Sequence, residues 1–200
     1  MKQSLIYLFL FVAGILLAIF VDLPDFLVAS SFSKWVLYLL ILLIGIQLGS
    51  GKNLFKAAKA FGGKIVLVPI ATIIGTFAAV SLVSIFLPHR SLTDCLSVGA
   101  GFAYYSLSSV LITEARGAEL GALALIANII REFCVLIFAP LMVKYFGKLA
   151  PINAGGATTL DVTLPVILKY SGQDFLVISA FHGMFLDMSV MLFVPLFLSL

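Results

Sequence analysis

The sequence predicts an all-α polytopic membrane protein with about five full transmembrane helices and two broken or re-entrant segments arranged as an internal repeat. The chain is 62% hydrophobic and 10% charged, with a mean hydropathy of +1.22, whereas a soluble domain is about half apolar and about a quarter charged. Several apolar runs are long enough to cross a hydrocarbon core of about 30 Å. We expect one transporter domain over 1–200, with three helices in 1–90, repeat copy one in 95–146 and copy two in 150–200.

Apolar runs at 5–21, 35–48 and 65–87 predict the first three helices. The loop between the second and third runs holds four lysines, Lys52, Lys56, Lys59 and Lys64. The positive-inside rule places this loop, and therefore the N-terminus, in the cytoplasm. A signal peptide is the alternative for the first run, but no convincing small-residue cleavage site follows it. Nucleic-acid binding explains the lysines poorly, because membrane-spanning runs flank them.

An internal repeat organises the rest of the chain, since 101–140 aligns with 156–195 at an offset of 55 residues. The alignment matches glycines, acids and a proline of one copy with the same residue types in the other, and one serine with an aspartate: Gly101 with Gly156, Ser106 with Asp161, Gly117 with Gly172, Glu119 with Asp174, Glu132 with Asp187, and Pro140 with Pro195. Duplicated units with intramembrane acids are typical of transporters. Chance matching of small residues is the alternative, because glycine is common in membrane helices.

Each copy begins with a glycine-rich, hydroxyl-rich segment, at 95–113 and 153–165, and continues into an apolar run, at 120–146 and 175–200. Irregular backbone survives at membrane depth only when it is buried in protein or lines a water-filled cavity. Each first segment is therefore predicted to be broken or re-entrant. Re-entry places Lys144 and Lys148 in the cytoplasm, as the positive-inside rule prefers, and makes the two copies inverted.

Glu132 is the strongest candidate for a functional residue. A helix that starts near Glu119 places it about 20 Å along the axis, near the membrane midplane, where a charge costs about 2.5–3.5 kcal/mol. An ion pair with Arg131 is the structural alternative, but adjacent helical residues do not face each other. Each is expected to contact another helix. Asn128 shares a helical face with both.

Asp161 lies in a glycine- and threonine-rich stretch that suits a broken helix. Glycine lets a ligand approach the backbone, and free N–H groups at the start of a half-helix attract a carboxylate. Helix capping is the alternative role for Asp161. We expect a binding pocket where 99–109 and 154–165 meet. Its predicted substrate-binding residues are Glu132, Asp161, Asn128, Tyr104, Ser106, Ser108, Gly155, Gly156, Thr158 and Thr159; the tyrosine could instead anchor the chain at the membrane interface.

The last run contains His182 and Asp187, which together with Glu132 are the candidates for proton coupling. A histidine titrates near neutral pH and can relay protons, although a buried packing histidine is the alternative. Because they are five residues apart, the two side chains cannot both line one narrow face of a helix. The cysteines, Cys95 and Cys134, show no disulfide or metal spacing. No cofactor, metal site, nucleotide loop or catalytic triad is predicted.

Several stretches resemble the bacterial L-lysine exporter family, LysO. They are LLIGIQLGSGKNL (42–54), GAGFAYYSLSSVLITEARGAELGALALIANIIREF (99–133), GGATTLDVTLPVI (155–167) and FHG (181–183). The resemblance implies a multi-pass carrier of the inner membrane that exports L-lysine and toxic lysine analogues by exchange with protons. The family's essential intramembrane glutamate matches Glu132.

Typical members of that family are longer, and their additional N-terminal three-helix module carries a second essential acid, an aspartate. The resemblance therefore implies a separately encoded small membrane subunit, or a homo-oligomer. It does not cover Asp187, whose role it leaves open.

The expected coupling step involves Glu132. Burial would let its carboxyl group take a proton when a cationic substrate leaves.

Other functions remain open from the residues alone. Ornithine, arginine or a polyamine would meet the same charges as lysine, and a structural subunit or a channel would have a similar composition. An intramembrane aspartyl hydrolase using Asp161 and Asp187 is a further alternative, but no GxGD-type motif surrounds either residue. The sequence favours a transporter rather than an enzyme, with membrane lipid as its surroundings and no nucleic-acid partner.

Overall fold

The computed structural model describes residues 64–200 together with isolated helical positions at 13, 16, 17, 20, 35, 39 and 42. Contacts divide the chain into Met1–Gln47 and Leu48–Leu200, and the fold below is that of the second unit. The predicted helices at 5–21 and 35–48, apart from those positions, and the lysines at 52, 56 and 59 lie outside the described residues.

Three long helices are apolar and long enough to cross a membrane: α5 (Leu67–Ser84), α8 (Ala118–Phe146) and α11 (Leu176–Ser199). They correspond to the predicted runs at 65–87, 120–146 and 175–200. Between residues 64 and 200 every regular element is a helix. The structure therefore confirms the predicted all-α membrane protein class.

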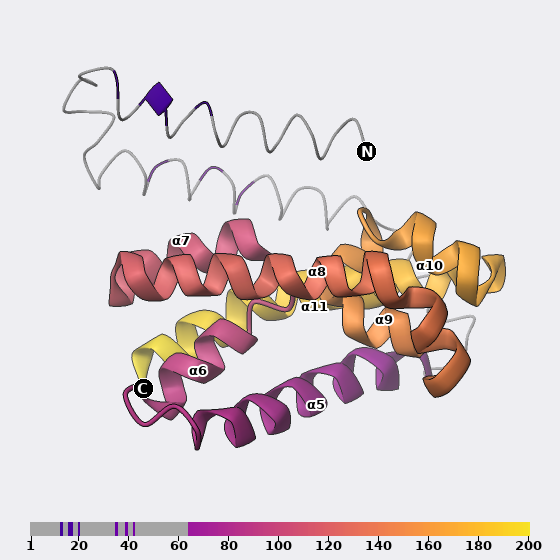
Figure 1. The fold of residues 1–200 in the computed structure, drawn as a ribbon, viewed down its shortest axis with the longest axis horizontal. Coiled ribbons are helices and arrows are strands. Elements are labelled where there is room, and N and C mark those ends of the chain that lie inside the picture. Colours follow the sequence, from indigo (N-terminus) through magenta and orange to yellow (C-terminus); the bar gives the residue numbers. More distant parts are fainter. Residues whose placement is uncertain are drawn as a thin grey trace. The chain divides into compact units, whose positions relative to one another are not determined.

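The segment predicted at 95–113 is a re-entrant hairpin, which we call hairpin one. It consists of α6 (Leu92–Gly99) and α7 (Tyr105–Arg116), separated by a non-helical tip. Both helices occupy the same half of the bundle (Figure 1). Arg116 Nε lies 3.2 Å from Asp94 Oδ1, so the end of α7 is tied to the start of α6. The two ends of hairpin one therefore lie on the same side of the bundle.

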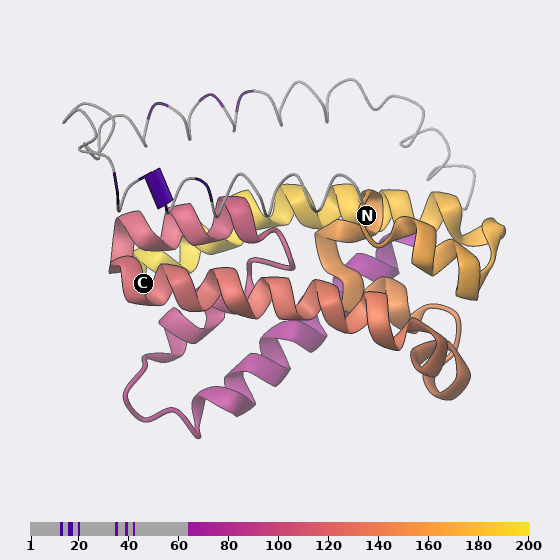
Figure 2. The same ribbon diagram turned by 45° about the horizontal axis from the view of Figure 1, so that its top comes forward.

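Hairpin two is the corresponding segment of the second copy. It consists of α9 (Ala150–Gly155), the 3-10 turn η2 (Gly156–Leu160) and α10 (Leu164–Ser171). Its base is closed where Ser171 Oγ donates to the carbonyl oxygen of Lys148 at 2.8 Å. It lies in the opposite half of the bundle from hairpin one (Figures 1 and 2). A short turn, η3 (Gln173–Phe175), then leads into α11.

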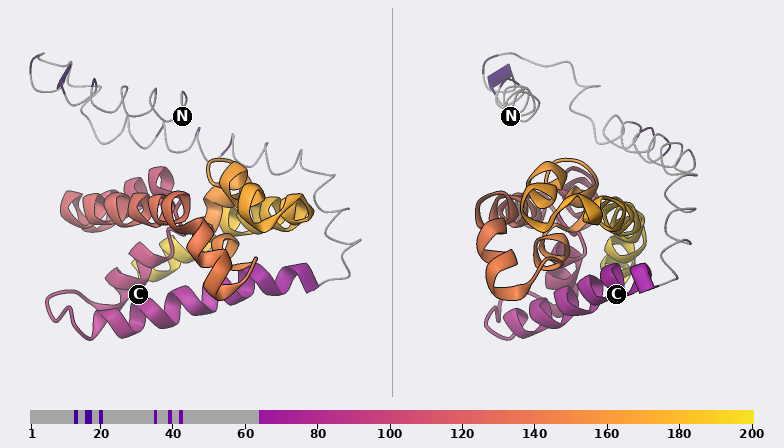
Figure 3. Two further views of the ribbon diagram at one scale, coloured as in Figure 1. Left: turned by 45° about the vertical axis from the view of Figure 1, so that its right-hand side comes forward. Right: turned by 90° about the vertical axis from the view of Figure 1, so that its right-hand side faces the viewer.

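The two hairpins meet at their tips, where the N–H of Ala157 donates to the carbonyl oxygen of Phe102 at 2.8 Å. Each hairpin passes into its long helix through a glycine with positive φ, Gly117 at 94° and Gly172 at 108°. These glycines are separated by the repeat offset of 55 residues. The two units, α6–α7–α8 and α9–α10–α11, therefore share the order of a hairpin followed by a long helix, and their hairpins lie in opposite halves of the bundle (Figure 3).

The tip of hairpin one has strained backbone, because Phe102 and Ala103 have φ values of 42° and 71°. A residue with a side chain pays about 1–2 kcal/mol in this left-handed region. The surrounding contacts must therefore fix this conformation.

Replacing Ala103 with glycine is expected to raise the free energy of unfolding by about 0.5–1 kcal/mol, because glycine relieves the left-handed strain but gains entropy when unfolded. Thermal unfolding in detergent measures the change. The matched variant Ala139→Gly, at a buried position inside α8, should instead lose about 1 kcal/mol. A less stable Ala103→Gly protein would show that the tip is not strained.

Candidate functional site

Glu132 lies on the buried face of α8 and is only 9% exposed. Its Oε2 atom is buried, and within the described part of the chain it has no hydrogen-bond partner. Buried carboxylate oxygens are normally paired, so an unsatisfied one needs an explanation. A buried carboxylate oxygen of this kind can accept a hydrogen bond from a ligand, or it can bind a proton.

Asp161 lies in the bend between η2 and α10, and its side chain is exposed. Its Oδ1 atom accepts from the N–H of Val162 at 2.5 Å. The residue at the N-cap of α10 is Thr163, and its side chain makes no capping hydrogen bond. Asp161 therefore does not cap α10, and its carboxylate remains at the surface of the hairpin tip.

Three of the predicted acids interact electrostatically through Asp161. Asp161 is close enough to interact electrostatically with both Glu132 of α8 and Asp187 of α11. Tyr104, at the tip of hairpin one, interacts in the same way with Asp187 and Asp161. In residues 64–200 no three acids, histidines or cysteines are arranged to hold a metal ion. We call Glu132, Asp161 and Asp187 the acid cluster.

Most of the predicted hydroxyl groups are used inside the hairpins. Thr158 Oγ1 donates to the carbonyl oxygen of Gly155 at 2.8 Å, and Thr159 Oγ1 donates to that of Gly156 at 2.9 Å. Ser108 is buried, and its Oγ donates to the carbonyl oxygen of Tyr104 at 2.8 Å. Ser106 is exposed at the start of α7. Direct binding of substrate by these groups stays a prediction.

His182 is fully buried, and both ring nitrogens have hydroxyl partners. Nε2 lies 2.9 Å from Thr72 Oγ1 of α5, and Nδ1 lies 3.0 Å from Thr159 Oγ1 of η2. The histidine therefore joins α11 to α5 and to the tip of hairpin two. This arrangement matches the packing alternative, while a proton relay through the ring stays a prediction.

Asn128 holds the strained tip of hairpin one against α8. Its Oδ1 accepts from the N–H of Ala103 at 2.7 Å, and its Nδ2 donates to the carbonyl oxygens of Ala124 and Val98 at 2.9 and 3.3 Å. The side chain is buried. The sequence predicted Asn128 as a substrate ligand, and the structure gives all three of these bonds to the protein itself.

Replacing Asn128 with alanine should lower the free energy of unfolding by about 2–4 kcal/mol, because the buried N–H of Ala103 loses its acceptor along with the other bonds. Thermal unfolding in detergent measures this loss. At low pH the protonated side chain of Asn128→Asp keeps the acceptor for Ala103 and one of the two donors, so this variant should have intermediate stability. Equal stability of Asn128→Ala and the parent protein would contradict the assigned role.

Arg131 was not predicted as a site residue, yet it binds the tip of hairpin two. Its Nε donates to the carbonyl oxygen of Ala154 at 2.8 Å, and its Nη2 donates to that of Asn153 at 3.2 Å. The guanidinium also lies 5.8 Å from the centre of the Phe102 ring. Because adjacent helical residues do not face each other, the sequence indicated that Arg131 and Glu132 have separate partners. It did not indicate that the partners of Arg131 are the carbonyl groups of hairpin two.

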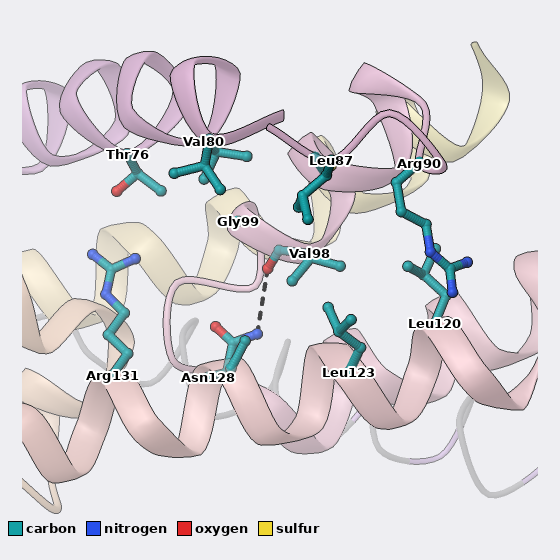
Figure 4. Close-up of a pocket in the computed structure, with 13 residues that line it drawn as sticks. Thr76, Val80, Leu87, Arg90, Val98, Gly99, Leu120, Leu123, Asn128 and Arg131 are labelled. Carbon is teal, nitrogen blue, oxygen red and sulfur yellow. Dashed lines mark hydrogen bonds between the residues drawn. The ribbon is translucent and has the colours of Figure 1, made fainter. Parts of the chain in front are cut away.

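A pocket of about 300 Å³ lies between α5, α6 and α8, beside the hairpin tips (Figure 4). Arg131 and Asn128 lie toward one end of the pocket, and Arg90 lies at the other end. The remaining lining is mostly apolar, from Thr76, Val80, Val83, Leu87, Cys95, Val98, Gly99, Leu120, Leu123 and Ala127. The predicted pocket between 99–109 and 154–165 is a different location and stays a prediction.

Comparison with known proteins identifies related sequences. The family model described as lysine exporter LysO matches residues 8–198. The lysine exporter LysO of Escherichia coli K12 is 30% identical over 172 residues, which are 84% of this chain and 56% of that protein. A putative lysine exporter of Haemophilus influenzae is 33% identical over 150 residues, 75% of each chain. No solved structure matches.

Proposed function

The chain belongs to the lysine exporter LysO family, and from this premise we propose that it carries L-lysine and toxic lysine analogues out of the cell. It spans 56% of the length of its Escherichia coli relative. The complete carrier would then include a small membrane subunit or a second copy of this chain. The cell inner membrane is the proposed location.

The acid cluster supports a substrate with more than one positive charge. Lysine has two ammonium groups and one carboxylate. Glu132 and Asp161 would bind the ammonium groups, because the two carboxylates are close enough to repel each other when no cation is present. Two half-helices, α7 and α10, begin without a side-chain cap, and the partial positive charge at their N-termini would attract the substrate carboxylate.

The single observation that carries this proposal is the unpartnered Oε2 of Glu132, buried beside the tips of two inverted hairpins. In transporters with inverted repeats, substrates bind near the midplane at broken helices. Proton antiport follows if the carboxyl group of Glu132 binds either a proton or an ammonium group. Asp187, at the repeat-related position, would be the second proton site.

The charges at the two ends of the bundle support an orientation. The end at the base of hairpin two has three lysines, Lys144, Lys148 and Lys169, and one nearby acidic residue among those described, Asp174. The other end balances Arg90 and Arg116 with Asp94, Glu114 and Glu119. By the positive-inside rule these lysines support a cytoplasmic position for the base of hairpin two. Hairpin one would then enter from the outer side.

Growth in the presence of a toxic lysine analogue tests the function. Cells that lack both this gene and its immediate neighbour should be sensitive, and restoring both genes should restore resistance and lysine efflux. Restoring this gene alone tests whether the chain needs the partner. A proton gradient should change the efflux rate if the carrier is an antiporter, whereas a channel would not respond. Equal sensitivity with and without the genes would reject lysine export.

A further inference from the structure

We propose that Arg131 is a positioning residue that holds the tips of the two hairpins together and thereby keeps Asp161 within reach of Glu132. The inference rests on the proposed function, since it gives Arg131 a part in forming the lysine site. It assigns no direct contact between Arg131 and the substrate.

A charge in the middle of a membrane helix requires a compensating partner, because an unpaired arginine in hydrocarbon is strongly unfavourable. Arg131 finds this compensation at the carbonyls of Asn153 and Ala154, at 3.2 and 2.8 Å. These two residues belong to the last turn of α9, where carbonyl groups lack helical partners and have partial negative charge. The arginine therefore fixes the end of α9 against α8.

The same guanidinium group also contacts hairpin one, because it lies 5.8 Å from the centre of the Phe102 ring. Such a cation–π contact is attractive, because the ring face carries partial negative charge. Phe102 is fully buried, and its carbonyl oxygen accepts the tip-to-tip hydrogen bond from Ala157. Arg131 thus contacts both hairpins directly beside the place where they join.

The position of Asp161 depends on this junction through a short, internally bonded path. The turn η2 runs from Gly156 directly to Leu160, the residue before Asp161. Within it, Thr158 and Thr159 bond back to the carbonyl oxygens of Gly155 and Gly156. A displacement at the end of α9 would therefore be passed to Asp161. Because Glu132 follows Arg131 on the same helix, one arginine sets the distance between the two acids.

Lysine should not replace this arginine. The guanidinium uses two donors for two carbonyls and presents its planar face to an aromatic ring, and a single ammonium group cannot reproduce this geometry. We therefore expect Arg131→Lys to resemble Arg131→Met more closely than it resembles the parent protein.

Transport kinetics in membrane vesicles that contain this chain and its neighbouring gene product provide the first test. Arg131→Met should raise the KM for lysine at least about tenfold, which corresponds to about 1.4 kcal/mol. Phe102→Leu should raise KM less, and the double variant should show no additional rise beyond Arg131→Met, because both changes remove one shared contact. Arg90→Gln is the matched control, since Arg90 pairs with the exposed Glu119, and its KM should stay within about twofold.

Chemical protection of the tip provides a second test that does not depend on transport. In a protein whose Cys95 and Cys134 have been replaced by alanine, Thr158→Cys introduces a thiol at a position that is 7% exposed. A small thiol reagent should label it at least about tenfold faster after Arg131→Met, corresponding to about 1.4 kcal/mol of opening, and no faster after Arg90→Gln.

The two readouts separate the inference from the proposed function. An unchanged labelling rate after Arg131→Met overturns the inference, whatever the transport rate. An Arg131→Met protein with the parent KM also overturns it. Faster labelling in a protein whose parent form carries no lysine supports the junction held by Arg131 and rejects lysine export instead.

Discussion

Replacing Glu132 with glutamine is expected to lower lysine export about 30-fold or more, because removing one charged partner of a buried pair costs about 2–5 kcal/mol and about 1.4 kcal/mol corresponds to tenfold. Glutamine has nearly the same volume and can fit the buried face of α8. The Oε2 atom accepts no hydrogen bond from the described residues, so the fold loses no known contact there. Efflux from preloaded vesicles measures export, and thermal unfolding in detergent measures stability.

Glu119→Gln is the matched control, because Glu119 lies near the start of the same helix and is exposed in a pair with Arg90. Its export rate should stay within about twofold, as expected for a surface ion pair. If Glu132→Gln exported lysine at the parent rate in exchange for protons, neither substrate binding nor proton coupling could be assigned to Glu132. Loss of exchange with retention of uncoupled efflux would separate those two roles.

The repeat allowed much of this fold to be predicted. The alignment matched Gly117 with Gly172, and the structure places both, with positive φ, where a hairpin passes into its long helix. The positive-inside rule favoured re-entry of the segment at 95–113, which forms hairpin one. The boundaries differ by a few residues: α6 begins at Leu92 because Ser91 Oγ caps it by accepting from the N–H of Asp94.

The contacts between the hairpins could not be predicted, because they depend on tertiary structure. Phe102 adopts a left-handed conformation that its residue type disfavours, and Asn128 and Arg131 hold it there. No local pattern indicates that an arginine will bind the carbonyls of a helix 22 and 23 residues away in sequence. Glu132 and Asp187 could be identified from the sequence, because a carboxylate within a long apolar run is unusual whatever its tertiary contacts.

The repeat also explains why equivalent positions have different roles. Asn128 aligns with Gly183, and both lie where a long helix packs against a hairpin tip. Asn128 binds its tip through a side chain, whereas Gly183 lets η2 approach α11 closely, since an added Cβ would lie 2.6 Å from the backbone nitrogen of Leu160. Each copy therefore fixes its hairpin to its long helix by a different means.

Replacing Gly156 with alanine is expected to lower the free energy of unfolding by about 3 kcal/mol or more and to abolish export. An added Cβ would overlap the carbonyl oxygen of Phe102, and overpacking of this kind costs about 1–3 kcal/mol. Gly156 also has a φ of 64°, which costs a residue with a side chain about 1–2 kcal/mol more. The obstacle is backbone, so no side-chain rotation can relieve it, and the hydrogen bond from Ala157 to Phe102 should break.

Two matched glycine variants separate this effect from a general intolerance of alanine. Gly75→Ala, at a position in α5 with nothing within 4 Å of the added atom, should be neutral or gain up to about 1 kcal/mol. Gly101→Ala, at the repeat-related position, should be milder than Gly156→Ala, because its new Cβ would meet the side chains of Asn128 and Ser108 at 2.5 and 2.7 Å. In both thermal unfolding and vesicle efflux, Gly75→Ala should be the least impaired variant, Gly101→Ala intermediate and Gly156→Ala the most impaired. Full stability and export by Gly156→Ala would mean that the hairpin tips do not need to touch, because that alanine cannot be accommodated without separating them.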